Sequence, residues 1–552
     1  MDKPSLVIVG AGMAGLTAAI TAAEHDLEVV LVEKSSKVGG AAAYSGGQVW
    51  IGANHVARRL GQHDSVEDTI AYVHAAAARD PSSVDAALCE RWIRGAADAA
   101  AWLEQVGAIE WETIPDYPDY FYPQLPGARA TGRYLTGAAF AGRRLGAART
   151  QLHVSPHFPV GITYGEMFSW GGMSSKLRWD LELVAQRQAQ DVLTFGAGIV
   201  AALWQAVLQR RVRVLLEHPV TSLLQTDGAV GGVVCAGPRG TVELRGAVIL
   251  ATGAHDWSSE HAERFTGIRG QDGGSVTPRT VSGDAMQLVH ALSGAVHALP
   301  AWAAPVIPGY QLVAPAFDGD TGYRACFEHC LPHTFLVNRR GERFCDDSFH
   351  SEIVARALEQ DDTGQPGNLP IFMVWDESHH ARFGLGRTMP GGAYPQGVVT
   401  SAPTLAELAE QLGIDPFGLA RTTARFNAMA RTGIDEDFGR GSNQSVRRFR
   451  GDASHHPNPN MGPVETAPFH GMRIRLLNTG IAAGGVCADG DGRVLRTDGT
   501  AVEGLYAVGE ASSRGAAGVG YNSGYSLSRA MAFGWLAARH VADRQTLRAP
   551  LQ

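Results

Sequence analysis

The first 33 residues of the chain carry the pattern that most constrains how it can fold. The apolar run LVIV at 6–9 predicts a buried strand, and the glycines of GAGMAG at 10–15 follow it directly. The stretch LTAAITAAEH then predicts a helix, and LEVVLVEK predicts a second strand that ends near Glu33. Strand, glycine turn, helix, strand and acid in this order are typical of a βαβ unit that binds a dinucleotide. The sequence therefore predicts an α/β fold built on a parallel sheet.

Each glycine of this turn has a physical task in such a unit. Gly10 allows the tight turn, and Gly12 lets a pyrophosphate approach the backbone at the positive end of the helix. Gly15 lets the helix pack closely on the strand. The carboxylate of Glu33 stands where it can accept hydrogen bonds from ribose hydroxyls.

Length and composition set further limits. The 552 residues suit two domains, or one large domain with an insertion. A formal net charge of -8 leaves no basic surface for nucleic acid. Six scattered cysteines fit reduced thiols better than a disulfide framework, so we expect a cytoplasmic protein. LVIV is too short for a signal peptide, and no run of about 18 apolar residues predicts a transmembrane segment.

Three more segments point to FAD as the dinucleotide. Gly39 and Gly40 follow Glu33 in a way that resembles the FAD-binding two-dinucleotide family. AVILATGA at 247–254 resembles the strand and turn that pack against that nucleotide fold, and GLYAVGEA at 504–511 resembles the segment on the ribitol side of the flavin. No second glycine fingerprint follows a strand, so no separate NAD(P) domain is expected.

The resemblance also implies how FAD is held. In the wider superfamily, covalent attachment uses a histidine near the first glycine pair, and none lies between residues 39 and 47, so we expect non-covalent FAD. Val220 falls where the family touches the adenine, and Glu510 can bond a ribitol hydroxyl. The residues expected to contact FAD are Gly10, Gly12, Ala14, Gly15, Glu33, Lys34, Gly39, Gly40, Ala41, Ser45, Gly46, Gly47, Val220, Ala251, Thr252, Gly253, Asp284, Gly509, Glu510, Ser526 and Leu527.

The texture of the sequence changes in its middle. From about residue 289 it becomes rich in proline and apolar residues, and TFLVNRRGERF predicts a hairpin. We therefore expect a Rossmann-like FAD-binding domain of the two-dinucleotide type in two parts, 1–288 and 441–552, with an α+β cap domain inserted at 289–440. Such an arrangement predicts a ligand site in the cleft between the domains.

Longer motifs narrow the family. They are GGAAAYSGGQVWIGAN at 39–54, YPDYFYPQLPGARATGR at 117–133, FAGRRLG at 140–146, FNAMARTGIDEDFGRG at 426–441, and the last helix, SRAMAFGWLAARHVA. All five resemble segments of 3-ketosteroid dehydrogenases, within the fumarate reductase and succinate dehydrogenase flavoprotein superfamily. The resemblance spans nearly the whole chain.

This resemblance implies an oxidoreductase that acts on CH–CH groups. It would use FAD to introduce a C=C bond next to the carbonyl of a cyclic ketone, either a 3-ketosteroid or a smaller cyclohexanone-type ring with or without a carboxylate. An arginine near the pocket would favour the carboxylated ring. The electron acceptor, a quinone or oxygen, is not readable from the sequence, and the resemblance requires no metal.

The loop GVGYNSG at 518–524 is where the ketone would be held. In the ketosteroid enzymes, a tyrosine hydroxyl and a glycine N–H of this loop donate to the substrate ketone, and here Tyr521 and Gly524 match them. Fumarate reductases carry in this loop an arginine that grips a carboxylate. Gly520 and Tyr521 stand in its place, and nearby Arg514 is a substitute or a structural residue.

The proton-abstracting base is left open by the sequence. The family uses two tyrosines. Tyr120 matches the first, with Tyr117 and Tyr122 as rivals, but the segment CDDSFHS at 345–351 lacks the second. His350 or Ser351 occupies that place. Histidine titrates near pH 6.5 and tyrosine near pH 10, so His350 would be the better base at about neutral pH. The open candidates are Tyr525, His350, Tyr120 and an unassigned group.

Other interpretations compete with desaturation. A reductase running the reverse reaction, a flavin monooxygenase and a flavoprotein that only binds ligands are the alternatives. The missing arginine argues against a dicarboxylate substrate, and no NADPH motif supports a monooxygenase. Cys326, His329, Cys330 and His333 resemble a zinc set only loosely, because paired Cys-x-x-Cys spacings are absent.

Overall fold

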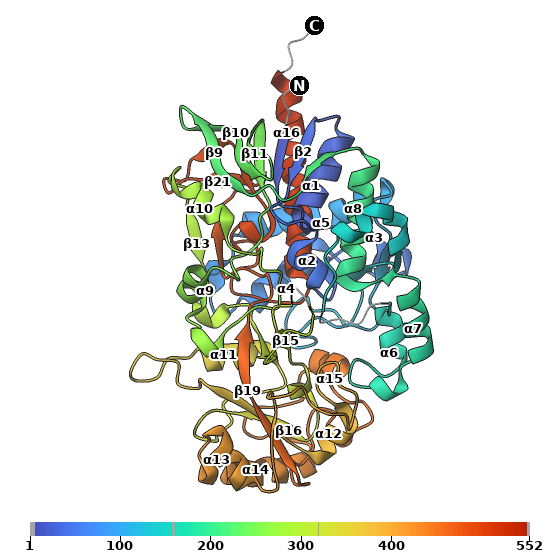
Figure 1. Cartoon of the computed structure of the whole chain (residues 1–552), viewed down its shortest axis with the longest axis vertical. Coiled ribbons are helices and arrows are strands. Elements are labelled where there is room, and N and C mark those ends of the chain that lie inside the picture. The colour runs from blue at the N-terminus through green and yellow to red at the C-terminus, as the bar shows by residue number, and fades with distance from the viewer. Residues whose placement is uncertain (1–5, 157–160, 318–319, 549–552) are drawn as a thin grey trace.

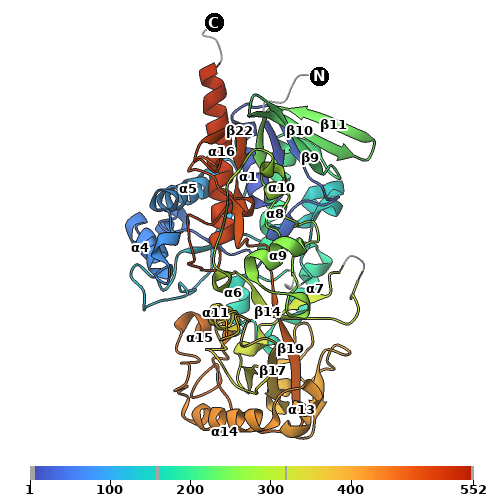
Figure 2. The same cartoon turned by 90° about the vertical axis from the view of Figure 1, so that its left-hand side faces the viewer.

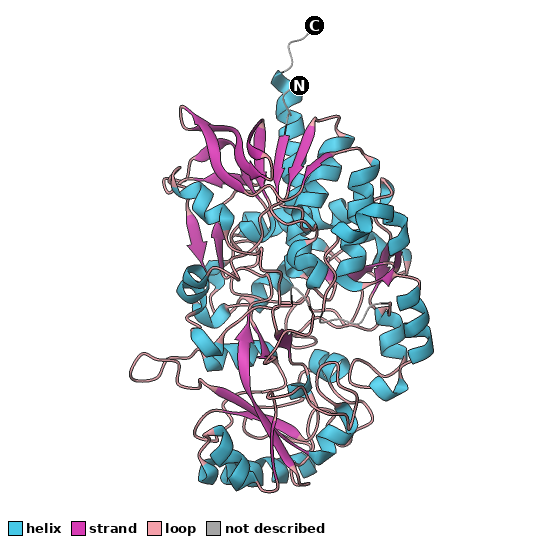
Figure 3. Ribbon diagram, in the orientation of Figure 1, coloured by secondary structure: helices cyan, strands magenta, loops and turns pink. Residues whose placement is uncertain are grey.

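The structure, a computed structural model, describes residues 6–156, 161–317 and 320–548. The molecule is elongated, with one domain around the N-terminal βαβ unit and a second at the other end (Figures 1 and 2). The largest sheets lie toward these two ends, and helices, loops and a few short strands fill the layer between them (Figure 3). We call the first the FAD domain and the second the cap.

The FAD domain is built on a six-stranded sheet in the order β21-β22-β12-β1-β2-β8. All neighbours are parallel except β21, which pairs antiparallel with β22. Every residue of β1 and β2 is buried, as expected for a parallel sheet covered on both faces. The strands are β1 (Leu6–Val9), β2 (Val29–Val32), β8 (Arg213–Leu215), β12 (Ala247–Leu250), β21 (Arg493–Leu495) and β22 (Ala501–Ala507).

Helices from both ends of the chain pack around this sheet. The helix after the glycine turn, α1 (Met13–Glu24), packs against the last helix, α16 (Tyr525–Arg548). Their contact is close, because a Cβ on Gly534 would lie 2.5 Å from the Ala14 carbonyl oxygen. The other helices of this half are α2 (Gly40–Tyr44), α3 (His55–Arg59), α4 (Val66–Ala76), α5 (Ala86–Gln105), α6 (Tyr164–Ser169), α7 (Leu181–Ala189), α8 (Phe195–Gln209), α9 (Ser259–Thr266) and α10 (Asp284–His290).

Smaller sheets surround the main one. A three-stranded antiparallel sheet, β11-β10-β9, lies at the outer end of the FAD domain (Figure 1), and β3-β5-β4 and β6-β7 lie along the segment 49–193. Their strands are β3 (Val49–Trp50), β4 (Trp111–Thr113), β5 (Tyr134–Gly137), β6 (Phe140–Ala141), β7 (Val192–Leu193), β9 (Val220–Thr226), β10 (Ala229–Gly237) and β11 (Gly240–Arg245). No helix of the described residues is both long and apolar enough to cross a bilayer.

The cap contains an antiparallel sheet in the order β15-β14-β19-β17-β16, and β18 also pairs with β19. Its strands are β14 (Ile307–Gln311), β15 (Tyr323–Ala325), β16 (Thr334–Val337), β17 (Ile371–Asp376), β18 (Thr400–Ala402) and β19 (Phe469–Leu477). Its helices are α11 (His350–Ala357), α12 (Glu377–Phe383), α13 (Leu405–Leu412), α14 (Pro416–Thr432) and α15 (Gln444–Arg450).

Strand pairing places the domain boundaries later than the sequence did. β13 (Val296–Ala298) pairs with β20 (Gly484–Val486), and Leu299 N–H donates to the Ala483 carbonyl, so the chain leaves the FAD domain after residue 298 rather than 288. β19 crosses the centre of the cap sheet, so the chain returns after Leu477 rather than at 441. Local composition alone did not predict these boundaries, because β19 joins the cap sheet only through hydrogen bonds to distant residues.

Candidate active site

A large cavity runs from the glycine turn of the FAD domain to the inner side of the cap. It encloses about 1720 Å³ of space, its open mouth included. Its walls come from the β1–α1 turn, the segment 40–48, the segment 508–510, the start of α16 and the cap residues that face them. One end is therefore lined by the predicted dinucleotide residues and the other by the predicted substrate residues.

The dinucleotide end is shaped by backbone rather than by side chains. Gly10 has a φ of +106°, and a Cβ there would lie 2.4 Å from the Ala251 carbonyl oxygen. A Cβ on Gly15 would lie 1.8 Å from the Gly10 carbonyl oxygen, so the helix can approach the turn only with glycine at this position. Gly12 lines the cavity at the start of α1, where backbone N–H groups favour an anion.

Polar groups at this end fit the adenosine half of FAD. Glu33 accepts hydrogen bonds from the N–H groups of Ala11 (2.9 Å) and Ser35 (2.8 Å), and burial raises the pKa of its carboxyl despite these bonds. Lys34 and Asp284 form an ion pair of 2.7 Å at the cavity wall. The buried hydroxyl of Thr252, also a lining residue, has no hydrogen-bond partner among the described residues. The chemistry of this wall therefore suits a ribose and its phosphates.

Most residues assigned to FAD from the sequence lie on this cavity. Gly15 and Gly39 do not line it and act through packing: Gly39 has a φ of +113°, and a Cβ there would lie 2.8 Å from the Ala43 side chain and 3.0 Å from the Val200 side chain. The lining residues among them are Gly10, Gly12, Ala14, Glu33, Lys34, Gly40, Ala41, Ser45, Gly46, Gly47, Val220, Ala251, Thr252, Gly253, Asp284, Gly509, Glu510, Ser526 and Leu527. Tyr44 and Gln48 also line it and lie in the 39–54 motif, whereas no sequence signal identified the lining residues His153, His218, Thr277, Gly480 and Ile481.

The substrate end brings together residues from three distant parts of the chain. Tyr120 lies between β4 and β5, His350 is the first residue of α11, and Tyr521 lies before α16. The ring centroids are 5.6 Å apart for Tyr120 and His350, 5.9 Å for His350 and Tyr521, and 6.1 Å for Tyr120 and Tyr521. All three line the cavity, together with Gly524 and Arg450.

The loop before α16 is fixed by a buried asparagine. Asn522 accepts hydrogen bonds from the Tyr72 hydroxyl (2.8 Å) and the Tyr120 N–H (2.9 Å), and it donates to the Tyr134 hydroxyl (2.6 Å). Because Asn522 is fully buried, these bonds fix the position of the loop that carries Tyr521 relative to the segment that carries Tyr120.

Two hydrogen-bond donors of this loop remain free for a ligand. Gly524 has a φ of +86°, and a Cβ there would lie 2.6 Å from the backbone nitrogen of Trp50. In the described part of the chain, neither the Gly524 N–H nor the Tyr521 hydroxyl donates to an acceptor. Burial raises the pKa of Tyr521, so its hydroxyl keeps its proton and can donate it to a carbonyl oxygen.

Tyr525, one of the predicted bases, lies outside the cavity. Its ring packs against Trp50 and Trp92, with centroids 4.8 and 5.0 Å away, and its buried hydroxyl has no hydrogen-bond partner among the described residues. Burial raises the pKa of Tyr525 well above 10. Tyr117 and Tyr122 do not line the cavity either. Tyr525 is the first residue of α16, and its side chain lies against Trp50 and Trp92 rather than in the cavity. Helix periodicity alone did not determine this orientation.

Arg450 is the residue of the substrate end that the sequence analysis missed. It ends α15, lines the cavity, and lies over the Phe327 ring with its guanidinium carbon 4.7 Å from the centroid. None of the carboxylates in the described ranges forms an ion pair with it, whereas most buried arginines here, such as Arg133, are paired. Its charge therefore faces the cavity without a counter-ion.

This charge acts on the neighbouring titratable groups. The pKa of His350 is lowered well below 6.5, first by burial and then by the charges of Arg450 and His329. Burial raises the pKa of Tyr120, and the charge of Arg450 opposes that rise. His350 is therefore a neutral imidazole at neutral pH.

Arg514 and the cysteine–histidine segment have structural positions. Arg514 donates to the Gly520 carbonyl at 2.8 Å and lies behind the Tyr521 ring, and burial lowers its pKa to about 10. It supports the loop and does not line the cavity. In the 326–333 segment, His329 bonds the Asp347 carbonyl and His333 bonds the Pro463 carbonyl, so their rings serve separate backbone contacts.

The fold and the cavity define a flavoprotein oxidoreductase. The chain belongs to the FAD binding domain family, whose model matches residues 5–527. It is 31% identical to the 3-oxosteroid 1-dehydrogenase of Mycobacterium tuberculosis, over 98% of each chain. It is 32% identical to the 4-oxocyclohexanecarboxylate 2-dehydrogenase of Sinomonas cyclohexanicum, over 98% of this chain and 93% of the relative. FAD is thus its cofactor, and dehydrogenation of a CH–CH group is its reaction class.

Solved structures agree with this assignment. The 3-ketosteroid Δ1-dehydrogenase from Sterolibacterium denitrificans, in complex with 1,4-androstadiene-3,17-dione, superposes with a TM-score of 0.87 at 26% identity, covering 99% of this chain and 100% of that one. A flavocytochrome c3 fumarate reductase gives a TM-score of 0.64 at 21% identity, covering 98% of this chain and 78% of that one, and shares the fold. The predicted Rossmann-like FAD fold and the predicted family resemblance are confirmed.

Proposed function

We propose that this FAD-dependent dehydrogenase desaturates a cyclic ketone that carries a carboxylate. The observation that carries the proposal is Arg450, which forms no ion pair with a carboxylate of the described residues and lines the same cavity end as Tyr521, Gly524 and His350. One of the dehydrogenases related to this chain, from Sinomonas cyclohexanicum, is named for 4-oxocyclohexanecarboxylate. A 3-ketosteroid is the second candidate, because other relatives are named for 3-oxosteroids.

The carbonyl is polarised by two donors. The hydroxyl of Tyr521 and the N–H of Gly524 donate to the ketone oxygen, which stabilises the enolate charge that develops when the adjacent C–H is broken. Neither donor has to give up an acceptor among the described residues to do so. Asn522 and Arg514 hold the loop in place before substrate binds.

Proton removal is assigned to His350. Its neutral imidazole takes the proton from the carbon next to the carbonyl, and Tyr120 is close enough to orient it. A bound FAD supplies the acceptor for the hydride that leaves the next carbon. The substrate thus loses one proton and one hydride, and the two carbons become joined by a double bond.

The carboxylate anchors the far side of the ring. Arg450 would pair with it and leave the opposite carbonyl against the loop, which fixes the orientation of a small ring. The pairing would also offset the charge that lowers the pKa of His350, and so strengthen the base once the correct substrate is bound.

Anaerobic mixing with a panel of ketones tests the proposal. The flavin absorbance should bleach with 4-oxocyclohexanecarboxylate, more slowly with cyclohexanone, and least with androstenedione. Fastest bleaching by the steroid would favour the second candidate. Reoxidation by an enone without bleaching by any ketone would contradict desaturation and favour a reductase.

The pH dependence should identify the base. With neutral cyclohexanone, we expect the acid limb of kcat well below pH 6.5, because protonation of His350 removes the base and its pKa is lowered. Activity is therefore retained as pH falls through 6.5 and is lost only as pH approaches that lowered pKa. His350→Gln should abolish the limb along with most turnover, and a limb that persists in this variant would assign the proton to another group.

FAD is expected to be bound without a covalent bond. Denaturation in acid, followed by removal of the protein, should leave all the FAD in solution. Yellow colour retained in the precipitate would contradict this expectation and direct attention to His153, a histidine that lines the cavity.

We further propose that the electrons pass to a quinone or to oxygen, and that the protein works in the cytoplasm. Support for the location comes from the cysteines, which are all free, with Cys487 the only one not fully buried. Comparing reoxidation rates of the reduced flavin by oxygen and by a soluble quinone would distinguish the two acceptors.

A further inference from the structure

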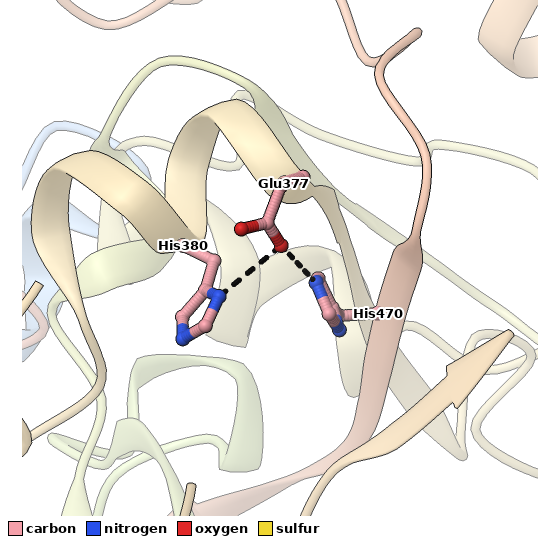
Figure 4. A group of neighbouring side chains, drawn as sticks. All are labelled: Glu377, His380 and His470. Atoms are coloured by element: carbon pink, nitrogen blue, oxygen red, sulfur yellow. Dashed lines mark hydrogen bonds and ion pairs between the residues drawn. The ribbon is translucent and has the colours of Figure 1, made fainter. Parts of the chain in front are cut away.

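A cluster of three ligating side chains lies in the cap, outside the cavity (Figure 4). Glu377 and His380 come from α12, and His470 comes from β19. Both histidine rings direct a nitrogen toward the same carboxylate oxygen, Oε2 of Glu377. The three ligating atoms lie within 4.8 Å of one another. Glu377 and His380 are three residues apart on one helix, so both face the strand.

The outer hydrogen bond of His380 determines which nitrogen carries its proton. Nε2 lies 2.9 Å from the Gly392 carbonyl oxygen, which can only accept, so Nε2 carries the hydrogen. In the neutral ring, Nδ1 then presents a lone pair to the Glu377 carboxylate, 3.2 Å away. Two lone pairs face each other there, and a positive species between them, a proton or a metal ion, is needed to join them.

His470 can take the same role. Its Nδ1 lies 2.8 Å from the Ser401 hydroxyl, which accepts as readily as it donates. When Ser401 accepts, Nε2 of His470 is a second free lone pair 3.2 Å from the Glu377 oxygen. Ligating histidines commonly give their other N–H to a carbonyl or a hydroxyl in this way.

The distances favour an ion over a proton. Charge-assisted N–H···O⁻ bonds measure about 2.7–2.9 Å, and both contacts here are longer, at 3.2 Å. Ligands at about 2.0–2.1 Å from a tetrahedral Zn²⁺ lie about 3.3 Å from each other. The two spacings between Glu377 and the histidines therefore match the edge of a metal tetrahedron.

We propose that Glu377, His380 and His470 bind a divalent transition-metal ion of the Zn²⁺ class. Two imidazoles and a carboxylate are ligands that such ions take. The ring of Tyr394 packs against both histidines, with its centroid 4.5 Å from that of His380 and 5.3 Å from that of His470. The Glu377 side chain is 35% exposed, so the fourth position opens to water. The ion joins α12 to β19 and stabilises the cap, which departs from the expectation of a metal-free protein.

Metal analysis of untagged, full-length holoprotein tests this site. After EDTA treatment and dialysis against Zn²⁺, we expect one zinc per FAD and a higher unfolding temperature. Glu377→Gln and His470→Gln should each weaken zinc affinity by at least about tenfold while flavin absorbance stays unchanged. X-ray absorption of the wild-type zinc complex should show two imidazole nitrogens and no sulfur.

A matched control separates this site from ordinary histidine–carboxylate pairs. His55 and Glu104 form such a pair at 3.0 Å, with side chains 20% and 21% exposed, and no third histidine, cysteine or carboxylate of the described residues joins them as a ligand. His55→Gln should leave zinc binding unchanged. The proposal would be overturned if the wild-type protein retained no zinc. It would also be overturned if the Glu377 and His470 variants bound zinc as tightly as the wild type, or if sulfur appeared in the coordination shell. The cluster would then consist only of contacts between Glu377 and the two histidines.

Discussion

Replacing Tyr521 with phenylalanine should slow ketone desaturation by about 10²- to 10³-fold in kcat, with FAD still bound. One donor to a developing oxyanion is worth about 3 kcal/mol, and Tyr521→Phe removes one of the two proposed here. The ring stays, so its packing against Tyr120 and His350 is kept. Stopped-flow bleaching of the flavin by saturating ketone measures the chemical step directly.

Tyr525→Phe is the matched control. Tyr525 lies four residues further on, but its hydroxyl is buried behind the loop and lacks a partner among the described residues. Its removal should leave kcat within about twofold and leave stability unchanged or raised, because an unpaired buried polar group is lost. Unchanged turnover in Tyr521→Phe, or a large loss in Tyr525→Phe, would reverse the roles assigned to the two tyrosines.

Replacing Arg450 with methionine should change which substrate is preferred. For 4-oxocyclohexanecarboxylate, kcat/KM should fall on the order of 10²- to 10³-fold, because losing one partner of a buried charge pair costs about 2–5 kcal/mol. Cyclohexanone should lose little, since it has no carboxylate to pair. Removing the Arg450 charge should also raise the pKa of His350 and move the acid limb for cyclohexanone upward.

Arg448→Met controls for general effects on α15. Arg448 lies on the same helix, its side chain is 44% exposed, and it does not line the cavity. It should leave both substrates unaffected. Equal losses for the acid and the neutral ketone in Arg450→Met would sink the carboxylate assignment and leave desaturation intact. Failure of wild-type protein to bleach with any ketone would instead reject the proposed reaction.

The FAD fold could be predicted from the sequence because its signals are local. Gly10 has a φ of +106°, Gly15 lies against the Gly10 carbonyl five residues away, and the strand before them is wholly buried. The cap boundary could not be predicted, because β19 joins the cap sheet through hydrogen bonds to residues about a hundred positions away. The local composition of the sequence does not indicate which distant strands pair.

The substrate site divides in the same way. Tyr120, His350, Tyr521 and Gly524 could be proposed from motif positions, and the structure brings them to one cavity end. Whether a side chain faces that cavity depends on packing: Tyr525 turns toward Trp50 and Trp92, while Arg450, at the end of an arginine-rich helix, turns inward.

The sequence by itself determined the nucleotide fold and the cofactor, because glycine turns and buried strands act over short stretches of chain. Only the tertiary structure decided which residues form the substrate end of the cavity and the cluster at Glu377. The substrate end joins side chains of the cap and the FAD domain, and the cluster joins side chains from two distant segments of the cap. The charge of Arg450, which lines the cavity without an ion-pair partner among the described residues, is a feature that only the tertiary structure shows.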